Sequence, residues 1–248
     1  MFLYKGGLVK KIILLCLIVL VPSGTFGQNN ENPANFIMGA VSQRALENEK
    51  TKEVNTEYKK RYVIEDLNKM EQPFTDRRGQ PIQKKNEVEL VSKGKGKIVE
   101  RFGRPISGGS SSMPNINFSR ALAFYDFNLA KTPIVMENGR AYHVINFKPS
   151  KNSRPKGDME EILARMAGNI YIDVEKLFIY KLNASLTKEY SRGWFIYRLA
   201  RADIALKQME FNDMVVIDSL VIIDKYYVFG SETFEKQTLT YNDYVYRP

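Results

Sequence analysis

This sequence is poor in the residue types that most often carry chemistry. Its 248 residues include one cysteine, one histidine and one tryptophan. A single cysteine excludes an internal disulfide and a zinc site built on several thiolates. No stretch carries an interpretable reaction centre, and neither a metal nor another cofactor is expected. The sequence therefore supports predictions of fold and compartment better than a prediction of activity.

The first 27 residues have the three-part layout of a secretory signal peptide. Three lysines precede the apolar run 12–21, and small residues follow up to Gly27. An uncleaved membrane anchor is the alternative, but this run is shorter than the roughly 20 residues that span a bilayer. We therefore expect residues 1–27 to be removed, with cleavage after Gly27 and loss of Cys16, which lies inside the run.

Residues 28–248 are expected to form one domain that depends on its hydrophobic core. This length is ample for a sizeable core. The net charge of +9 falls to +6 once the three N-terminal lysines are gone. Such an excess suits an anionic membrane surface or keeps the protein soluble. An exported chain without a recognisable nucleic-acid motif is not expected to bind nucleic acid, and after signal cleavage it is not expected to be an integral membrane protein.

The start of this domain predicts a helix over residues 33–52. Asn32 offers an N-cap, and Pro33 suits the first helical position. Apolar residues then recur at roughly helical spacing, which predicts an apolar stripe facing a sheet. A frayed tail is the alternative, because alanine and glycine define this stripe weakly.

The next segment predicts strands. Tyrosine and aliphatic residues sit among charges over 57–70, as expected of a strand with one solvated face. A turn is predicted at 78–81, followed by a hairpin of 84–92 and 97–102. The connection 93–96 reads Lys-Gly-Lys-Gly and lacks the spacing and the Lys-Ser/Thr end of a phosphate-binding loop. It is therefore interpreted as a solvated turn.

Two segments in the middle of the chain lack a clear period. Residues 103–114 hold three glycines, two prolines and four serines, which is typical of a flexible connection. Residues 117–131 are dense in aromatics without alternation, which favours a short helix or an irregular segment laid against the sheet. Packed core is the simpler interpretation of these aromatics, and a flap over an apolar cavity is the alternative.

The stretch 138–186 predicts most about the architecture. Asn138 and Gly139 lie between apolar runs and take the positive φ values of a two-residue hairpin turn. A crossing segment follows that carries a short helix over 158–166, and then a strand that ends at 172–173. Alternation over 177–186 predicts a half-buried strand with Phe178, Tyr180 and Leu182 on one face.

The C-terminal third is strand-rich. Residues 194–209 fit a helix or a strand, and short apolar patterns do not decide between them. Residues 214–229 and 233–246 are predicted strands that turn at Gly230-Ser231.

Several motifs of this region carry a family resemblance. They are Asn138-Gly139-Arg140-Ala141-Tyr142, Phe147-Lys148-Pro149, Arg154-Pro155-Lys156, the run from Met166 to Asp173, and Tyr241-Asn242-Asp243-Tyr244. Together they resemble the LolA/LolB-like superfamily of exported bacterial proteins, which is related to outer-membrane lipoprotein sorting. The matching region runs from about 134 to 246. One departure is Val216-Ile217-Asp218, where relatives often place an aromatic residue and a proline.

The resemblance implies an α+β fold, with a strongly curved antiparallel sheet, or half-barrel, whose concave face is covered by helices. In the best-known members that cavity holds lipoprotein acyl chains. It also implies the periplasm or cell envelope of a Gram-negative bacterium. A non-enzymatic protein that binds or carries an apolar or amphipathic ligand, such as a lipid or lipoprotein acyl chain, is therefore expected. An interaction or sensor module for an envelope protein partner is the alternative.

The strands supply candidate ligand contacts, and the crossing segment supplies cations. The candidate lining residues are Phe178, Tyr180, Leu182, Val216, Leu220, Ile222 and Tyr226. The candidates for an anionic headgroup are Arg154, Lys156 and Arg165, although a solvated basic face is the simpler interpretation. For any one apolar residue, a place in the core is the simpler interpretation.

A hydrolase is the third hypothesis. His143 is the single histidine, and it lies in a predicted strand, where a structural imidazole is more common than a general base. Asp173 falls in the turn before the predicted strand 177–186, and other acidic residues open the helix at 158. No spacing in the sequence brings these two acidic groups together as an acid-base pair. We therefore expect no catalytic residues.

Overall fold

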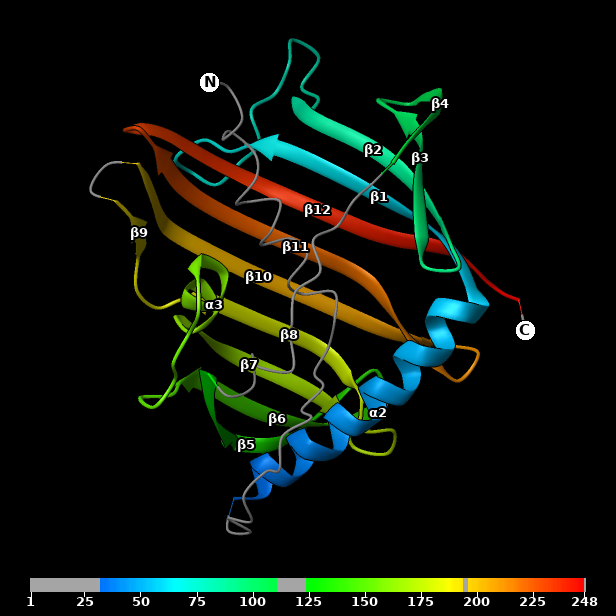
Figure 1. Cartoon of the computed structure of the whole chain (residues 1–248), viewed down its shortest axis with the longest axis vertical. Coiled ribbons are helices and arrows are strands. Elements are labelled where there is room, and N and C mark those ends of the chain that lie inside the picture. The colour runs from blue at the N-terminus through cyan, green and yellow to red at the C-terminus, as the bar shows by residue number, and fades with distance from the viewer. Residues whose placement is uncertain (1–31, 111–123, 194–195, 248) are drawn as a thin grey trace.

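A computed structural model describes residues 32–110, 124–193 and 196–247, without the side chains of 49–54 and 107–110. Over these residues twelve strands form one sheet, in which every pairing is antiparallel, and two helices accompany it (Figure 1). The strand order is β4-β3-β2-β1-β12-β11-β10-β8-β7-β6-β5, with β9 paired to β10, and the sheet does not close on itself. The predicted antiparallel α+β architecture is confirmed in this form.

The elements have the following bounds. The strands are β1 (Thr56–Asp66), β2 (Gln83–Ser92), β3 (Lys95–Arg101), β4 (Arg104–Ser110), β5 (Tyr125–Glu137), β6 (Arg140–Pro149), β7 (Met166–Asp173), β8 (Ile179–Leu186), β9 (Tyr190–Arg192), β10 (Tyr197–Phe211), β11 (Met214–Val228) and β12 (Ser231–Tyr246). The helices are α2 (Pro33–Asn55) and α3 (Asp158–Leu163).

The N-terminal helix α2 is confirmed, and its first turn is capped as the sequence predicts. The Asn32 Oδ1 atom accepts a hydrogen bond of 3.0 Å from the Ala34 backbone N–H, which satisfies one of the helix's first unpaired donors. Neither described helix is long and apolar enough to cross a membrane.

Short turns with positive φ connect the hairpins. Asn138 and Gly139 have φ values of 52° and 78°, and they join Glu137 to Arg140 in the register of β5 and β6. This confirms the predicted hairpin. Pairs of consecutive residues with positive φ also occur at Lys93-Gly94, Phe102-Gly103, Asn212-Asp213 and Phe229-Gly230. The last turn therefore lies one residue before the predicted Gly230-Ser231.

Two segments differ from their predicted structure. Residues 104–110 form strand β4 beside β3, so the connection predicted over 103–114 is wrong there, because the Phe102-Gly103 turn folds the chain back. Residues 125–131 belong to β5 and are not helical. An irregularity between Leu129 and Ile134 interrupts the β5–β6 register, which hides the alternation that marks a strand.

Other predictions fall partly or wholly outside the described residues. These are the signal peptide 1–27, the end of the connection at 111–114 and residues 117–123. The ambiguous segment 194–209 is a strand, β10, from Tyr197 onward.

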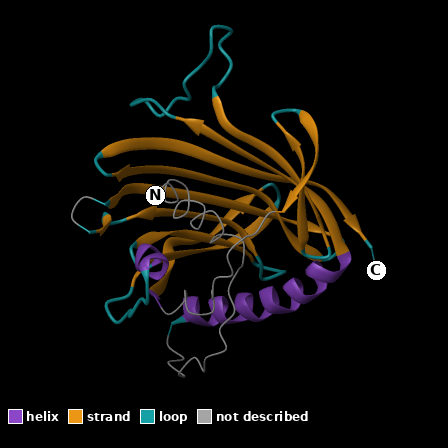
Figure 2. Cartoon of the chain, turned by 45° about the horizontal axis from the view of Figure 1, so that its top comes forward, coloured by secondary structure: helices purple, strands orange, loops and turns teal. Residues whose placement is uncertain are grey.

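Both helices lie on the same face of the sheet (Figures 1 and 2). α2 packs against β5 and β11, and α3 packs against β9. Met38 and Val41 of α2 and Ile162 of α3 belong to one core cluster with the sheet. We call this side the helix face, since strand residues that share it meet the helices in the core.

Candidate functional site

The helix α2 is tied to the sheet near each of its ends. The Asn32 side-chain amide donates a 2.7 Å hydrogen bond to the Phe127 carbonyl on β5. The Asn48 side chain accepts from the Val215 N–H at 2.7 Å and donates to the Val215 carbonyl at 2.8 Å on β11. These two bonds to one backbone residue fix where the helix lies along β11 as well as its distance from that strand. α2 therefore bridges strands that lie far apart in the sheet.

One part of the helix face is an apolar floor. Residues directly opposite each other in antiparallel strands share a face, and the register aligns Ile145 with Ile170, and Ile204 with Ile222. All four are at most 6 % exposed. The apolar floor comprises Phe127, Ile145, Phe147, Ile170, Ile172, Ala184, Ile204, Leu206, Leu220 and Ile222, all in one core cluster.

The same face becomes polar toward β12 and β1. Asp224 follows Leu220 and Ile222 in the same alternating set of β11, and it lies opposite Glu235 of β12. Asp224 and Gln237 are both 0 % exposed. We call this group the polar cluster, which comprises Tyr62, Tyr197, Asp224, Tyr226, Glu235 and Gln237.

The Gln237 side chain holds the polar cluster together. Its amide nitrogen donates to Asp224 Oδ1 at 3.1 Å and to Glu235 Oε1 at 2.9 Å. Its oxygen accepts the Tyr62 hydroxyl at 2.7 Å. Both donors are therefore used, and the amide has no further N–H for the second oxygen of either carboxylate. Glu235 Oε2 instead lies 3.5 Å from the Lys84 ammonium.

Two oxygen atoms of the polar cluster have no hydrogen-bond partner. They are Asp224 Oδ2 and the Tyr197 hydroxyl, and both are buried. The Tyr197 ring stacks with Tyr226 at a centroid distance of 6.0 Å. A buried polar atom without a partner costs about 1–3 kcal/mol. Such atoms in a native structure call for a specific explanation.

Burial shifts the titration of the cluster. It raises the pKa of the Asp224 carboxyl well above its ordinary value, and the neighbouring charge of Glu235 adds to the effect. Burial also raises the pKa of Glu235 and that of Tyr226, to about 12. The carboxylates thus lie where negative charge is poorly solvated.

A separate buried ion pair lies farther along the same face. Lys60 of β1 and Glu89 of β2 form a salt bridge, and each residue is 6 % exposed. Burial lowers the pKa of Lys60 despite this partner. A Cβ atom on Gly96 would lie 1.7 Å from Glu89 Oε1, so this glycine leaves the room that the Glu89 side chain occupies.

The structure brings together four of the seven predicted lining residues. Leu182, Leu220, Ile222 and Tyr226 share the helix face, because Leu182 and Leu220 both lie opposite Leu206.

The other three lie elsewhere. Tyr180 falls at an irregularity in the β7–β8 register and stacks on Tyr142 at 4.5 Å, on the opposite face. Val216 neighbours Ile217 of the core cluster and so points to the opposite face. Phe178 precedes β8, where its carbonyl accepts from the Asp173 N–H at 2.9 Å.

The three predicted headgroup ligands lie around α3. Arg165 is already engaged, since its Nη1 donates to the Glu161 carbonyl at 2.7 Å and lies 3.2 Å from the Glu161 carboxylate. Arg154 and Lys156 are exposed in the loop before the helix. An anion at this position would compete with Glu161 for Arg165.

The register separates His143 from Asp173. His143 lies opposite Ile172 and Tyr142 lies opposite Asp173, so the histidine and the aspartate point to opposite faces. The Asp173 Oδ1 atom accepts from the backbone N–H groups of Glu175 and Lys176 at 3.0 and 2.8 Å. Asp173 thus stabilises a turn. Among the described residues, no group of three His, Cys, Asp or Glu side chains is placed to hold a metal ion.

The sequence reasoning missed the polar cluster. The available signal was Asp224, a carboxylate in the alternating set that otherwise holds Leu220, Ile222 and Tyr226. A charged residue in an apolar set marks a buried polar site. The partners Gln237 and Tyr62 lie on other strands, so only the sheet register identifies them.

No protein-family model matches this chain, and no curated protein matches it. The sheet nonetheless has solved counterparts. This chain is similar to LolA-superfamily structures. One is a LolA superfamily protein from Nitrosomonas europaea, with 10% identity, a TM-score of 0.33, and coverage of 87% of this chain and 94% of the other.

Two further structures are similar at the same level. A domain from Vibrio parahaemolyticus, named for outer membrane lipoprotein sorting, has 12% identity and a TM-score of 0.33 over 82% of this chain and 91% of the other. A DUF1329 family protein from Desulfovibrio piger has 9% identity and a TM-score of 0.34 over 87% and 94%. The function proposed for this chain rests on its own residues.

Proposed function

We propose that this protein is a non-enzymatic protein of the bacterial cell envelope that binds an apolar or amphipathic ligand on the helix face. The observation that carries the proposal is the division of this face. An apolar floor adjoins a polar cluster that retains buried, unpartnered oxygen atoms. A ligand with an apolar chain and a polar end matches both parts. The lysine-led apolar segment at the N-terminus supports export.

The reach of α2 supports a concave helix face. Asn32 and Asn48 are sixteen residues apart, about 24 Å along a helix, and they bond to β5 and β11. Five strand spacings separate these strands, which is also about 24 Å across a flat sheet. α2 runs obliquely to the strands (Figure 1), so its reach across them is shorter. A sheet bent toward the helix accounts for the difference.

Native mass spectrometry and lipid extraction test this proposal on protein purified from its own envelope. We expect a bound species of defined mass that extracts into organic solvent. A protein that is repeatedly empty in mild detergent-free preparations would contradict the proposal.

A pair of variants locates the ligand. Ala202 is 0 % exposed and lies opposite Asp224, so Ala202→Leu adds volume between the apolar floor and the polar cluster. We expect it to reduce the ligand load. Ala205→Leu places the same side chain at an exposed position of the opposite face and should leave the load unchanged. Circular dichroism must show that both variants are folded.

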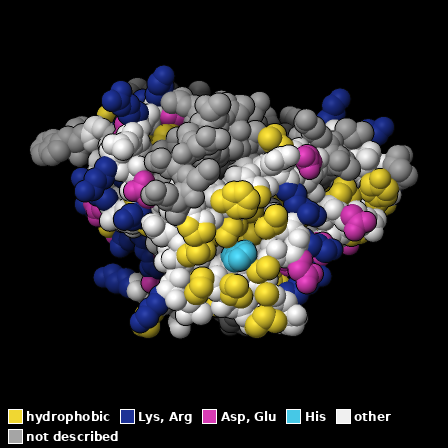
Figure 3. Space-filling model, turned by 90° about the horizontal axis from the view of Figure 1, so that it is seen from below, with side chains coloured by type: hydrophobic (Ala, Val, Ile, Leu, Met, Phe, Trp, Pro, Cys, Tyr) yellow, Lys and Arg dark blue, Asp and Glu magenta, His cyan; other side chains and the backbone are white. Residues whose placement is uncertain are grey.

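A specific observation favours a second function, contact with an envelope protein partner. β5 ends the sheet order, and its Ile134 and Met136 are 49 % and 69 % exposed. Hydrophobic side chains gather around His143, whose strand pairs with β5, in the view from below (Figure 3). An apolar sheet edge is a template for an added strand of another chain.

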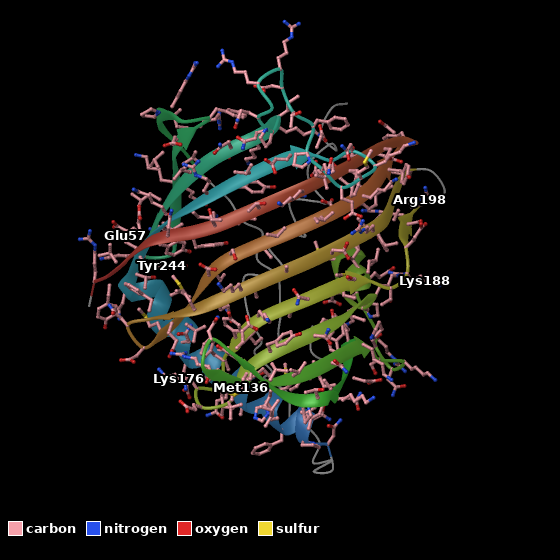
Figure 4. All side chains as sticks on the ribbon, turned by 180° about the vertical axis from the view of Figure 1, so that it is seen from behind. Glu57, Met136, Lys176, Lys188, Arg198 and Tyr244 are labelled. Atoms are coloured by element: carbon pink, nitrogen blue, oxygen red, sulfur yellow. The ribbon has the colours of Figure 1, made fainter. Side chains whose placement is uncertain are left out.

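Site-specific photocrosslinking at Met136 tests this second function. Met136 lies at this end of the molecule, near Lys176 (Figure 4). We expect one dominant crosslinked protein from Met136 and none from a matched probe at Lys188. Equal labelling from both positions would count against a dedicated partner.

A further inference from the structure

The unpartnered atoms of the polar cluster define a chemical class of ligand. Asp224 is 0 % exposed and Tyr197 is 8 % exposed, and each has a buried oxygen without a hydrogen-bond partner. A carboxylate oxygen accepts hydrogen bonds only, while a hydroxyl both donates and accepts. When the Asp224 carboxyl is ionised, its unpartnered oxygen needs a hydrogen-bond donor. Burial raises the pKa of the free carboxyl, so a cationic donor would favour the ionised form as it binds.

The local charge indicates a cationic donor. Asp224, Glu235 and Asp66 bring three carboxyl groups to this end of the helix face, and Lys84 is the ammonium that pairs with two of them. It lies 2.5 Å from Asp66 and 3.5 Å from Glu235. Asp224 is left without an ion pair among the described residues. A cation at Asp224 would offset this excess of negative charge.

The aromatic rings indicate an ammonium group. Tyr197 stacks on Tyr226, and Tyr190 lies 6.4 Å from Tyr197. Tyrosine faces attract ammonium ions within about 6 Å of the ring centre, and the attraction is stronger away from water. Rings combined with carboxylates are selective, because they repel a carboxylate or phosphate ligand and attract an amine.

We infer that the polar cluster is a binding site for the protonated amine of an amphipathic ligand, with the ammonium at Asp224 and Tyr197 and the apolar chain on the neighbouring floor. Leu220 and Ile222 precede Asp224 along the same face of β11, so the ligand's apolar chain extends from Asp224 directly onto the apolar floor. The position of the ligand's apolar chain rests on the proposed function, whereas the position of its ammonium group rests on the polar cluster alone. It is opposite in charge to the ligand that Arg154, Lys156 and Arg165 would select.

Three probes with the same twelve-carbon chain separate headgroup from chain. Dodecylamine, dodecanol and dodecanoate are titrated into the delipidated exported protein below their micelle concentrations or, for dodecanol, below its solubility, with calorimetry at neutral pH. We expect dodecylamine to bind at least about tenfold more tightly than dodecanol, as a charge-assisted hydrogen bond requires, and dodecanoate to bind most weakly. Equal affinity for all three would overturn the inference and leave the proposed function standing. Binding of none would overturn both.

A variant pair assigns the amine preference to Asp224. Asp224→Asn keeps the shape and the acceptor for Gln237 but removes the charge, so the preference for dodecylamine should fall by about tenfold while dodecanol binding is kept. Asp203→Asn removes a carboxylate that pairs with Arg201 on the opposite face and should change neither. Melting curves report folding of both variants. An unchanged amine preference in folded Asp224→Asn protein would show that the amine does not bind at Asp224 and would overturn the inference.

Discussion

The apolar floor and the polar cluster lie on the same face of the same sheet, yet different forces hold them. The apolar floor is stabilised by the burial of apolar surface, a force that depends little on the orientation of the side chains. The cluster depends on directed bonds, and Gln237 alone connects two carboxylates and a hydroxyl. A floor residue is therefore replaceable by another of similar volume, whereas the cluster tolerates few replacements. The floor is thus held by packing, and the cluster is held by directed bonds while two of its oxygen atoms have no hydrogen-bond partner.

The largest expected effect comes from the floor. Ile145 is 0 % exposed, so Ile145→Ala removes buried methyl groups and leaves a cavity. We expect a loss of about 3 kcal/mol in the free energy of unfolding, measured by urea denaturation. Ile134→Ala, at a half-exposed position of β5, is the control and should cost far less. Equal losses would contradict the assignment of the floor.

The next effect comes from the centre of the polar cluster. Gln237→Leu has similar volume but leaves Asp224 and Glu235 without their shared donor, so we expect a loss of about 2 kcal/mol in the free energy of unfolding. Urea denaturation measures it. A gain in stability would mean that the cluster is not held by this amide.

A smaller loss is expected where α2 is tied to the sheet. Asn48→Ala removes two hydrogen bonds to the Val215 backbone, each worth about 1 kcal/mol or less in net terms. Thermal melting should show a lower Tm. The control is Gln43→Ala on the exposed side of α2, whose contact with Glu47 is 3.5 Å long, and it should have no measurable effect.

The smallest expected effect concerns Asp224 of the polar cluster, and its sign is opposite to that of the three losses above. In the folded state burial raises the pKa of Asp224, so the folded protein holds this proton at pH values where the unfolded chain has lost it. The free energy of unfolding therefore falls progressively as the pH rises through a window. The window begins at about 4, the pKa of an aspartate in the unfolded chain, and ends at the pKa of Asp224 in the folded protein.

Asp224→Asn removes this titration. We expect its Tm to exceed that of the wild type by about 2–4 °C at neutral pH, with a smaller difference near pH 4. Differential scanning calorimetry across this range measures the difference. Asp203→Asn should show no pH-dependent gain, and a constant difference for Asp224→Asn would contradict the argument.

Local patterns predicted the parts of this fold that depend on neighbouring residues. Asn138-Gly139 indicated its hairpin because both residues take positive φ, and Asn32-Pro33 indicated the start of α2 through capping chemistry. Residues 125–131 were missed because the β5 irregularity breaks the alternation of the strand. Tyr180 was placed on the wrong face of β8 for the same reason, since an irregularity in one register reverses the side on which a residue lies.

The sequence by itself determined the hairpin at Asn138-Gly139, the helix α2 and the strands β11 and β12, because turn chemistry and periodicity act within a few residues. Only the tertiary structure decided which side chains meet. Asp224, Gln237 and Tyr62 come from three strands, and the register of β11, β12 and β1 places them on one face. The polar cluster is a property of that pairing, which no local pattern encodes.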